Sequence, residues 1–143
     1  GDHRDLHRVD RRQRQMCIRD RPSLFRKAKH LRVSSEKLHT YKSAIDRQNK
    51  EVPKTVAIRR DIHVAESDKD AKQVRELVNA KGYRGFDNNA LIIGDASAVA
   101  EEFYNFYDLG YTDIIVRNLH RDPEKALAST ERLMQVREKL GIK

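Results

Sequence analysis

Residues 55–65, TVAIRRDIHVA, decide the fold, because they alternate polar and apolar side chains and are rich in β-branched ones. This pattern predicts a β-strand with one charged and one apolar face. Two apolar runs, ALII at 90–93 and TDIIV at 112–116, predict further strands, the first of them buried on both faces. Stretches of helical periodicity separate the three, which is typical of parallel strands joined by right-handed crossovers. The sequence therefore predicts the α/β class.

Four amphipathic helices are predicted around these strands. The first covers 35–48, with Ser34 or Ser35 as its N-cap. Each of the others begins at a side chain that can accept hydrogen bonds from first-turn amides, in turn Ser67, Asp95 and Asp122. Gly82 and Gly110 are expected just past two of the helix ends. The predicted apolar stripes are Leu38, Tyr41 and Ile45; Ala71, Val74 and Leu77; Val99, Phe103 and Phe106; and Leu133, Val136 and Leu140.

Length and composition suit one domain. The chain has 143 residues, of which 38% are apolar and 36% charged. No apolar run reaches the roughly 18 residues of a membrane span, so no membrane is expected. The single cysteine, Cys17, cannot form an internal disulfide, which favours a reducing cytoplasm.

The net charge of +8 raises the alternative of a small basic α/β module that binds nucleic acid or another polyanion. Residues 1–21 contain seven Arg and four Asp and so supply +3 of that charge. They read as a disordered basic arm. In addition, RRQRQMCIRDR at 11–21 resembles a translated sequencing adapter, in which case 1–21 is non-native. On either interpretation Cys17 receives no functional role, and no zinc-finger, KH or RNP pattern supports nucleic-acid binding.

Two architectures agree with this order of elements: an open doubly wound sheet, or part of a barrel. Three strands alone make a poor sheet because both edges stay unpaired. A complete (β/α)8 barrel needs about 250 residues. We therefore expect 22–143 to be a portion of a larger domain, and its open edges predict aggregation, loose packing or homo-oligomerisation.

Three segments resemble the closing third of luciferase-like flavin-dependent oxidoreductases: AIRRDIHVAES at 57–67, GYRGFDNNALIIGDASAVAEEF at 82–103, and LGYTDIIVRNLHRDPEKAL at 109–127. The resemblance implies the sixth, seventh and eighth strands of a (β/α)8 TIM barrel. It further implies a monooxygenase that oxidises a small organic substrate with oxygen and reduced flavin mononucleotide (FMN), or a relative that uses a deazaflavin. A flavin reductase is then an expected partner. The isolated chain would be inactive, because the absent strands supply most flavin contacts in that family.

Arg59, Asp61 and His63 should share one face of the first strand. The resemblance implies that this face points into the barrel and lines the substrate or flavin cavity. The alternative is an ion pair, between Arg59 and Asp61 or with a neighbouring strand, that only satisfies buried charge.

Three further residues are candidates for the same cavity. Arg84 lies in a glycine-rich loop that the resemblance makes a mobile lid, and guanidinium binds phosphate or sulfonate well. Arg117 and His120 follow the last strand, at the barrel end where active sites lie. Each could equally be an ordinary surface side chain. No Ser–His–Asp set, catalytic carboxylate pair or Cys/His metal spacing is apparent, so the catalytic residues stay unassigned and no metal is predicted.

Overall fold

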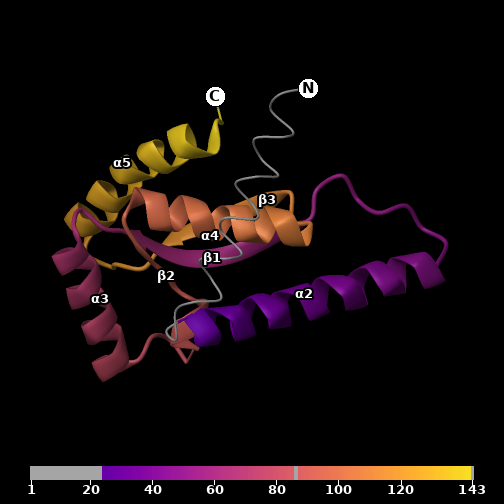
Figure 1. Ribbon diagram of the computed structural model, residues 1–143, viewed down its shortest axis with the longest axis horizontal. Helices are drawn as coiled ribbons and strands as arrows, with labels where there is room; N and C mark the ends of the chain where they lie inside the picture. The colour runs from indigo at the N-terminus through magenta and orange to yellow at the C-terminus, as the bar shows by residue number, and fades with distance from the viewer. Residues whose placement is uncertain (1–23, 86, 143) are drawn as a thin grey trace.

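The computed structural model describes residues 24–85 and 87–142 (Figure 1). The predictions for 1–21 and Cys17 lie outside these residues. Three parallel strands form one sheet: β1 (Ala57–Val64), β2 (Ile92–Gly94) and β3 (Asp113–Asn118). The α-helices of this part of the chain are α2 (Leu24–Arg47), α3 (Asp68–Lys81), α4 (Ala96–Leu109) and α5 (Pro123–Leu140). The predicted α/β class with parallel strands is therefore confirmed.

The strand order is β2-β1-β3, so the first strand lies in the middle of the sheet. Three consecutive strands of a barrel would instead follow one another in chain order, and the prediction of three consecutive barrel strands is wrong in this respect. β2 pairs with β1 only at positions 62–64. α4 then carries the chain across to the other side of β1, where β3 pairs with it from Ala57↔Asp113 to Ile62↔Asn118. Among the strands of residues 24–85 and 87–142, only β1 and β3 pair over more than three residues.

One face of the sheet carries the main apolar core. Ile62 and Val64 of β1 belong to it and pack with side chains from α2, α4 and α5. The best buried members of this core are Ile62, Val64, Val99, Phe106 and Val136. The opposite face of the sheet carries every second side chain of β1 and of β3. On β1 these are Arg59, Asp61 and His63, and on β3 they are Ile115 and Arg117.

α3 belongs to a second, smaller cluster at the carboxyl end of β1 (Figure 1). Its buried residues Ala71, Val74 and Val78 pack with Leu91 and Ile93 from the segment of β2. The predicted stripe residue Leu77 is wrong, since it is 47% exposed and Val78 is buried in its place. The cluster covers the carboxyl end of the polar face, since Ile93 is the register partner of His63 and Tyr83 packs against the cluster.

Helix boundaries follow the predicted caps closely. Ser67, Asp95 and Asp122 accept hydrogen bonds from Asp70, Ala98 and Glu124 amides respectively. α2 is the exception, because it begins at Leu24 and not at residue 35 as predicted, and Ser34 lies buried inside it. No Pro or Gly interrupts 24–34, so nothing in the backbone chemistry stops the helix there. Of its predicted stripe, Leu38 is buried but Tyr41 is 44% exposed.

β3 is less buried than its sequence suggests. Ile115 is 56% exposed and Val116 37% exposed, whereas Leu91, Ile92 and Ile93 around β2 are buried as predicted. β3 lies at one side of the three-stranded sheet, with β1 as its only strand neighbour there. The sheet thus ends in an apolar strand whose outer edge is unpaired within the described residues. No helix among those residues is long and apolar enough to cross a lipid bilayer.

Replacement of Phe106 should test the main core. Phe106 is 1% exposed, and the change Phe106→Ala removes a ring from the core between sheet and helices. We expect the free energy of unfolding, measured by urea titration, to fall by about 3–5 kcal/mol. The neighbouring change Tyr107→Ala is the control, because Tyr107 is 60% exposed and its loss should cost less than about 0.5 kcal/mol. Equal losses in the two variants would contradict this account of the core.

Candidate functional site at the carboxyl ends of β1 and β3

Asp61 is the centre of a polar group that joins the two main strands. It is 7% exposed, and its carboxylate accepts hydrogen bonds from Arg117 Nη2 at 2.6 Å and Arg117 Nε at 3.1 Å. The hydroxyl of Tyr83 donates to the same carboxylate at 2.6 Å. Because Asp61 and Arg117 are register partners in parallel strands, their side chains emerge side by side on one face. The pairing of β1 with β3 therefore assembles this group.

These contacts control the charge of Asp61. Burial by itself would raise the pKa of this carboxyl, but hydrogen bonds from Arg117 and Tyr83 and the nearby charge of Arg59 outweigh it and lower the pKa below 3.8. The same contacts raise the pKa of Arg117, chiefly through the hydrogen bond to Asp61. Burial and the hydrogen bond to Asp61 raise the pKa of Tyr83. At neutral pH the site holds a carboxylate, a guanidinium and a neutral phenol.

A second polar group lies one step closer to the strand ends. His63 is 2% exposed, and its Nε2 lies 2.9 Å from Asp70 Oδ2 at the start of α3. Its Nδ1 lies 3.0 Å from Nε2 of His120, which follows β3. The two imidazole rings meet edge to face, with centroids 4.5 Å apart. The structure thus brings together four of the six predicted cavity residues: Asp61, His63, Arg117 and His120.

Arg59 and Arg84, the other two predicted residues, are both exposed. Arg59 lies on the same face as Asp61 and acts on it through charge, with no ion pair between the two among the described residues. Asp61 instead forms the other ion pair considered as an alternative, with Arg117 of the neighbouring strand. Arg84 has a left-handed backbone, with φ of 49°, and its guanidinium lies 5.6 Å from the centre of the Tyr83 ring. It reaches the site through Tyr83 and has no described contact with the Asp61 carboxylate.

Sequence reasoning missed Tyr83 and Asp70 as members of the site. Tyr83 belongs to the glycine-rich loop after α3, next to the predicted residue Arg84. Asp70 lies in the first turn of α3, where an acidic side chain is already explained by the helix dipole. A usable signal existed for Asp70, because a carboxylate in the turn after a strand can reach a polar side chain near that strand's end. Nothing in the spacing of Tyr83 pointed to Asp61, which lies 22 residues away.

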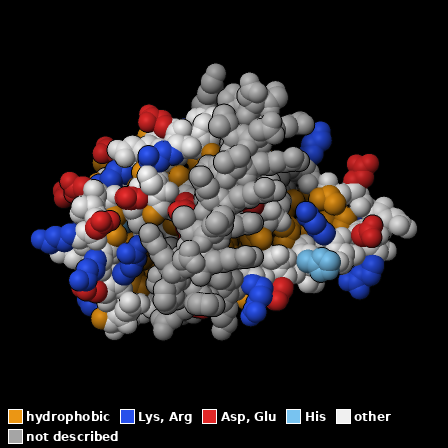
Figure 2. All heavy atoms as spheres, viewed as in Figure 1, with side chains coloured by type: hydrophobic (Ala, Val, Ile, Leu, Met, Phe, Trp, Pro, Cys, Tyr) orange, Lys and Arg blue, Asp and Glu red, His pale blue; other side chains and the backbone are white. Residues whose placement is uncertain are grey.

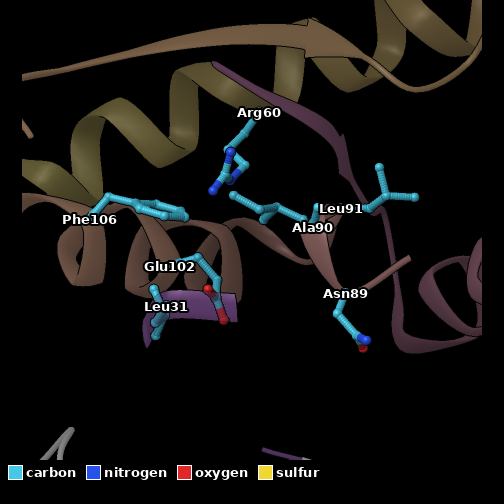
Figure 3. A pocket seen from close by; sticks show the side chains of 8 residues that line it. Leu31, Arg60, Asn89, Ala90, Leu91, Glu102 and Phe106 are labelled. Carbon is cyan, nitrogen blue, oxygen red and sulfur yellow. The ribbon is translucent and has the colours of Figure 1, made fainter. Parts of the chain in front are cut away.

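Arg60 was also missed, and it points to the opposite, apolar face of β1. Its guanidinium lies 4.7 Å from the centre of the Phe106 ring and donates to Ser34 Oγ at 2.9 Å. Figure 3 shows it directed toward Phe106 in a small pocket, with Glu102 and Leu31 across from it. Burial lowers the pKa of Arg60, partly offset by Tyr111 and Glu102. Because these contacts hold a helix against the sheet, we assign this arginine a structural role.

Other classes of site find little support in the described part of the chain. No group of three or more His, Cys, Asp or Glu side chains there could hold a metal ion. The amino end of α4 is capped by Asp95 itself, as predicted, which leaves it poorly suited to an anion. Comparisons with protein families, with curated proteins and with solved structures find no match to this chain. The geometry of the two polar groups is therefore the guide to function.

The change Asp61→Asn should make the free energy of unfolding depend less on pH in the acidic range. Since the pKa of Asp61 is lower in the folded than in the unfolded chain, the carboxylate stabilises the fold above about pH 4, and this contribution disappears as pH falls through the folded-state pKa. At pH 7 the variant should lose about 1 kcal/mol of unfolding free energy. In urea titrations from about pH 7 to pH 2, the gap between variant and parent should close.

Asp46→Asn is the matched control, because Asp46 is exposed near the end of α2. It should leave stability at each pH close to that of the parent chain. A constant gap between Asp61→Asn and the parent down to the lowest pH would show that the carboxylate charge of Asp61 does not stabilise the fold.

Proposed function

We propose that this chain is the carboxyl-terminal part of a luciferase-like flavin-dependent oxidoreductase with a (β/α)8 barrel. In the complete protein, Asp61, His63, Arg117 and His120 line the flavin and substrate cavity. The proposal assigns β1 and β3 as neighbouring barrel strands and β2 as a short addition beside β1. It thereby replaces the expectation of three consecutive strands.

The observation that carries the proposal is where the polar side chains gather. They come from the carboxyl ends of two adjacent parallel strands, on the sheet face away from α2, α4 and α5. In a (β/α)8 barrel the helices lie outside, and the active site lies at the carboxyl ends of the strands. Asp61 is nearly buried and accepts hydrogen bonds from three donor atoms, which is unusual for a carboxylate on a solvated surface. The exposed apolar edge of β3 further supports a missing neighbour strand.

The exposed side chains of this face suit part of a flavin site. Ile115 offers an apolar surface between Arg59 and Arg117 on the paired strands. An apolar side chain can pack on a flavin ring, and guanidinium groups can bind a phosphate or a negatively charged substrate. FMN or a deazaflavin, when bound, would supply the electron transfer. This chain would contribute one wall of the cavity and fixed charges that orient the substrate.

The decisive experiment joins the chain to the upstream segment recovered from its source DNA. We expect the restored protein to bind reduced FMN or reduced deazaflavin in an anaerobic fluorescence titration. Arg117→Lys should weaken binding of the flavin or raise the KM of the substrate about tenfold, because lysine cannot make the two-point contact with Asp61. Arg47→Lys, at the exposed end of α2, should change neither. Absence of binding to both cofactors would refute the proposal.

The alternative function is polyanion binding by a small basic module. Where Figure 2 shows coloured side chains, Lys and Arg are intermixed with Asp and Glu. We therefore expect retention on heparin near 0.15 M salt to depend on residues 1–21, which contain seven Arg and four Asp. The truncated chain 22–143 should be retained much less than the full chain. Equal retention of both chains, together with no flavin binding by the restored protein, would favour the polyanion-binding module.

A further inference from the structure

Asp70, His63 and His120 form a continuous hydrogen-bonded row in which two partly exposed side chains flank the buried His63. Asp70 Oδ2 and His63 Nε2 are 2.9 Å apart, and His63 Nδ1 and His120 Nε2 are 3.0 Å apart. The middle member is 2% exposed, while His120 is half-buried at the rim of the strand ends. Three of the four imidazole nitrogens are engaged in this row. The fourth, His120 Nδ1, has no hydrogen bond assigned within the described residues.

The row determines where the protons lie when both rings are neutral. An ionised Asp70 can only accept, so His63 carries its proton on Nε2. His63 Nδ1 is then an acceptor, and the proton between the rings belongs to His120 Nε2. His120 Nδ1 is left with a lone pair. The carboxylate thus specifies the tautomer of a ring that it does not touch.

We propose that Asp70, His63 and His120 form a proton relay in which His120 Nδ1 is the entry point. A proton that binds there forms an N–H bond at His120 Nδ1. The N–H bond at His120 Nε2 breaks, and its proton forms a new N–H bond at His63 Nδ1. His120 returns to a neutral ring of the opposite tautomer, and the positive charge ends on His63 beside Asp70. The reverse sequence releases a proton at the surface.

The surrounding charges favour this distribution. Burial lowers the pKa of His120, and His63 and Lys125 add to the effect, while Asp70 and Asp122 only partly oppose it. Burial would raise the pKa of Asp70, but hydrogen bonds from the Glu66 amide and from His63 outweigh it, with the charge of Arg132 acting in the same direction.

Asp70 therefore stays ionised where the relay ends. Arg132 Nη2 lies 4.0 Å from Asp70 Oδ2, and its positive charge disfavours a second positive charge on His63. The Asp70 carboxylate lies between the two positive groups and screens one from the other.

The relay would let His120 act as a general base or acid toward a weakly acidic group of a substrate at the carboxyl ends of the strands. That use rests on the proposed function. The relay itself rests only on the three side chains, so it can be tested without flavin or substrate. A failure of flavin binding would leave the relay intact, and a failure of the relay would leave the barrel assignment intact.

The test is nitrogen NMR of the full chain with ¹⁵N-labelled histidine. Long-range proton–nitrogen spectra between about pH 5 and pH 8 identify the tautomer and charge of each ring. His63→Gln and His120→Gln assign the signals among the six histidines. We expect His120 to carry its proton on Nε2 at high pH and on Nδ1 at low pH. Signals of His63 and His120 should change together with one midpoint.

Asp70→Asn should lower this shared midpoint by about one pH unit or more, a tenfold weaker proton affinity. Asp68→Asn is the matched control, since Asp68 also lies in the first turn of α3 and is exposed. It should leave the midpoint in place. A neutral His120 protonated on Nδ1, or separate titrations of the two rings, would overturn the proposal. The tautomer measurement on the unaltered chain decides this even if Asp70→Asn fails to fold.

Discussion

The alternation of side chains along β1 is the constraint on which the structure depends. β1 is the central strand, so each of its residues must face either the helices or the opposite side of the sheet. Ile62 and Val64 fill the core, which forces Asp61 and His63 to the other face, where both are nearly buried. Buried polar side chains need partners. β3 and α3 supply them as Arg117 and Asp70, and this requirement determines the composition of the site.

Local features of the fold could be predicted from the sequence. The capping residues Ser67, Asp95 and Asp122 and the strand of 55–65 were found because each depends on neighbouring residues only. Strand order could not be found in this way. Strand order depends on the side of β1 to which α4 carries the chain. The sequence of the short β2 is compatible with either side of β1. The early start of α2 was missed because a serine that can cap a helix can also lie buried within one.

The site was predicted in part for the same reason. Asp61 and His63 were found through the period of one strand, and Arg117 and His120 through their position after another. Their partners Tyr83 and Asp70 come from other elements, and only the packing of α3 against the strand ends brings them close. Arg60 shows the limit of periodicity, since a charged residue at a core position is compatible with the fold once Phe106 and Ser34 accommodate its guanidinium.

The Asp61–Arg117 contact joins residues 56 positions apart. Closing a loop of that length costs about 3–4 kcal/mol of chain entropy before any contact compensates for it. Chains with many such distant contacts fold slowly. During synthesis β1 leaves the ribosome well before β3. Until β3 has emerged, Asp61 cannot pair with Arg117. The polar group at the strand ends therefore cannot form until β3 has been synthesised.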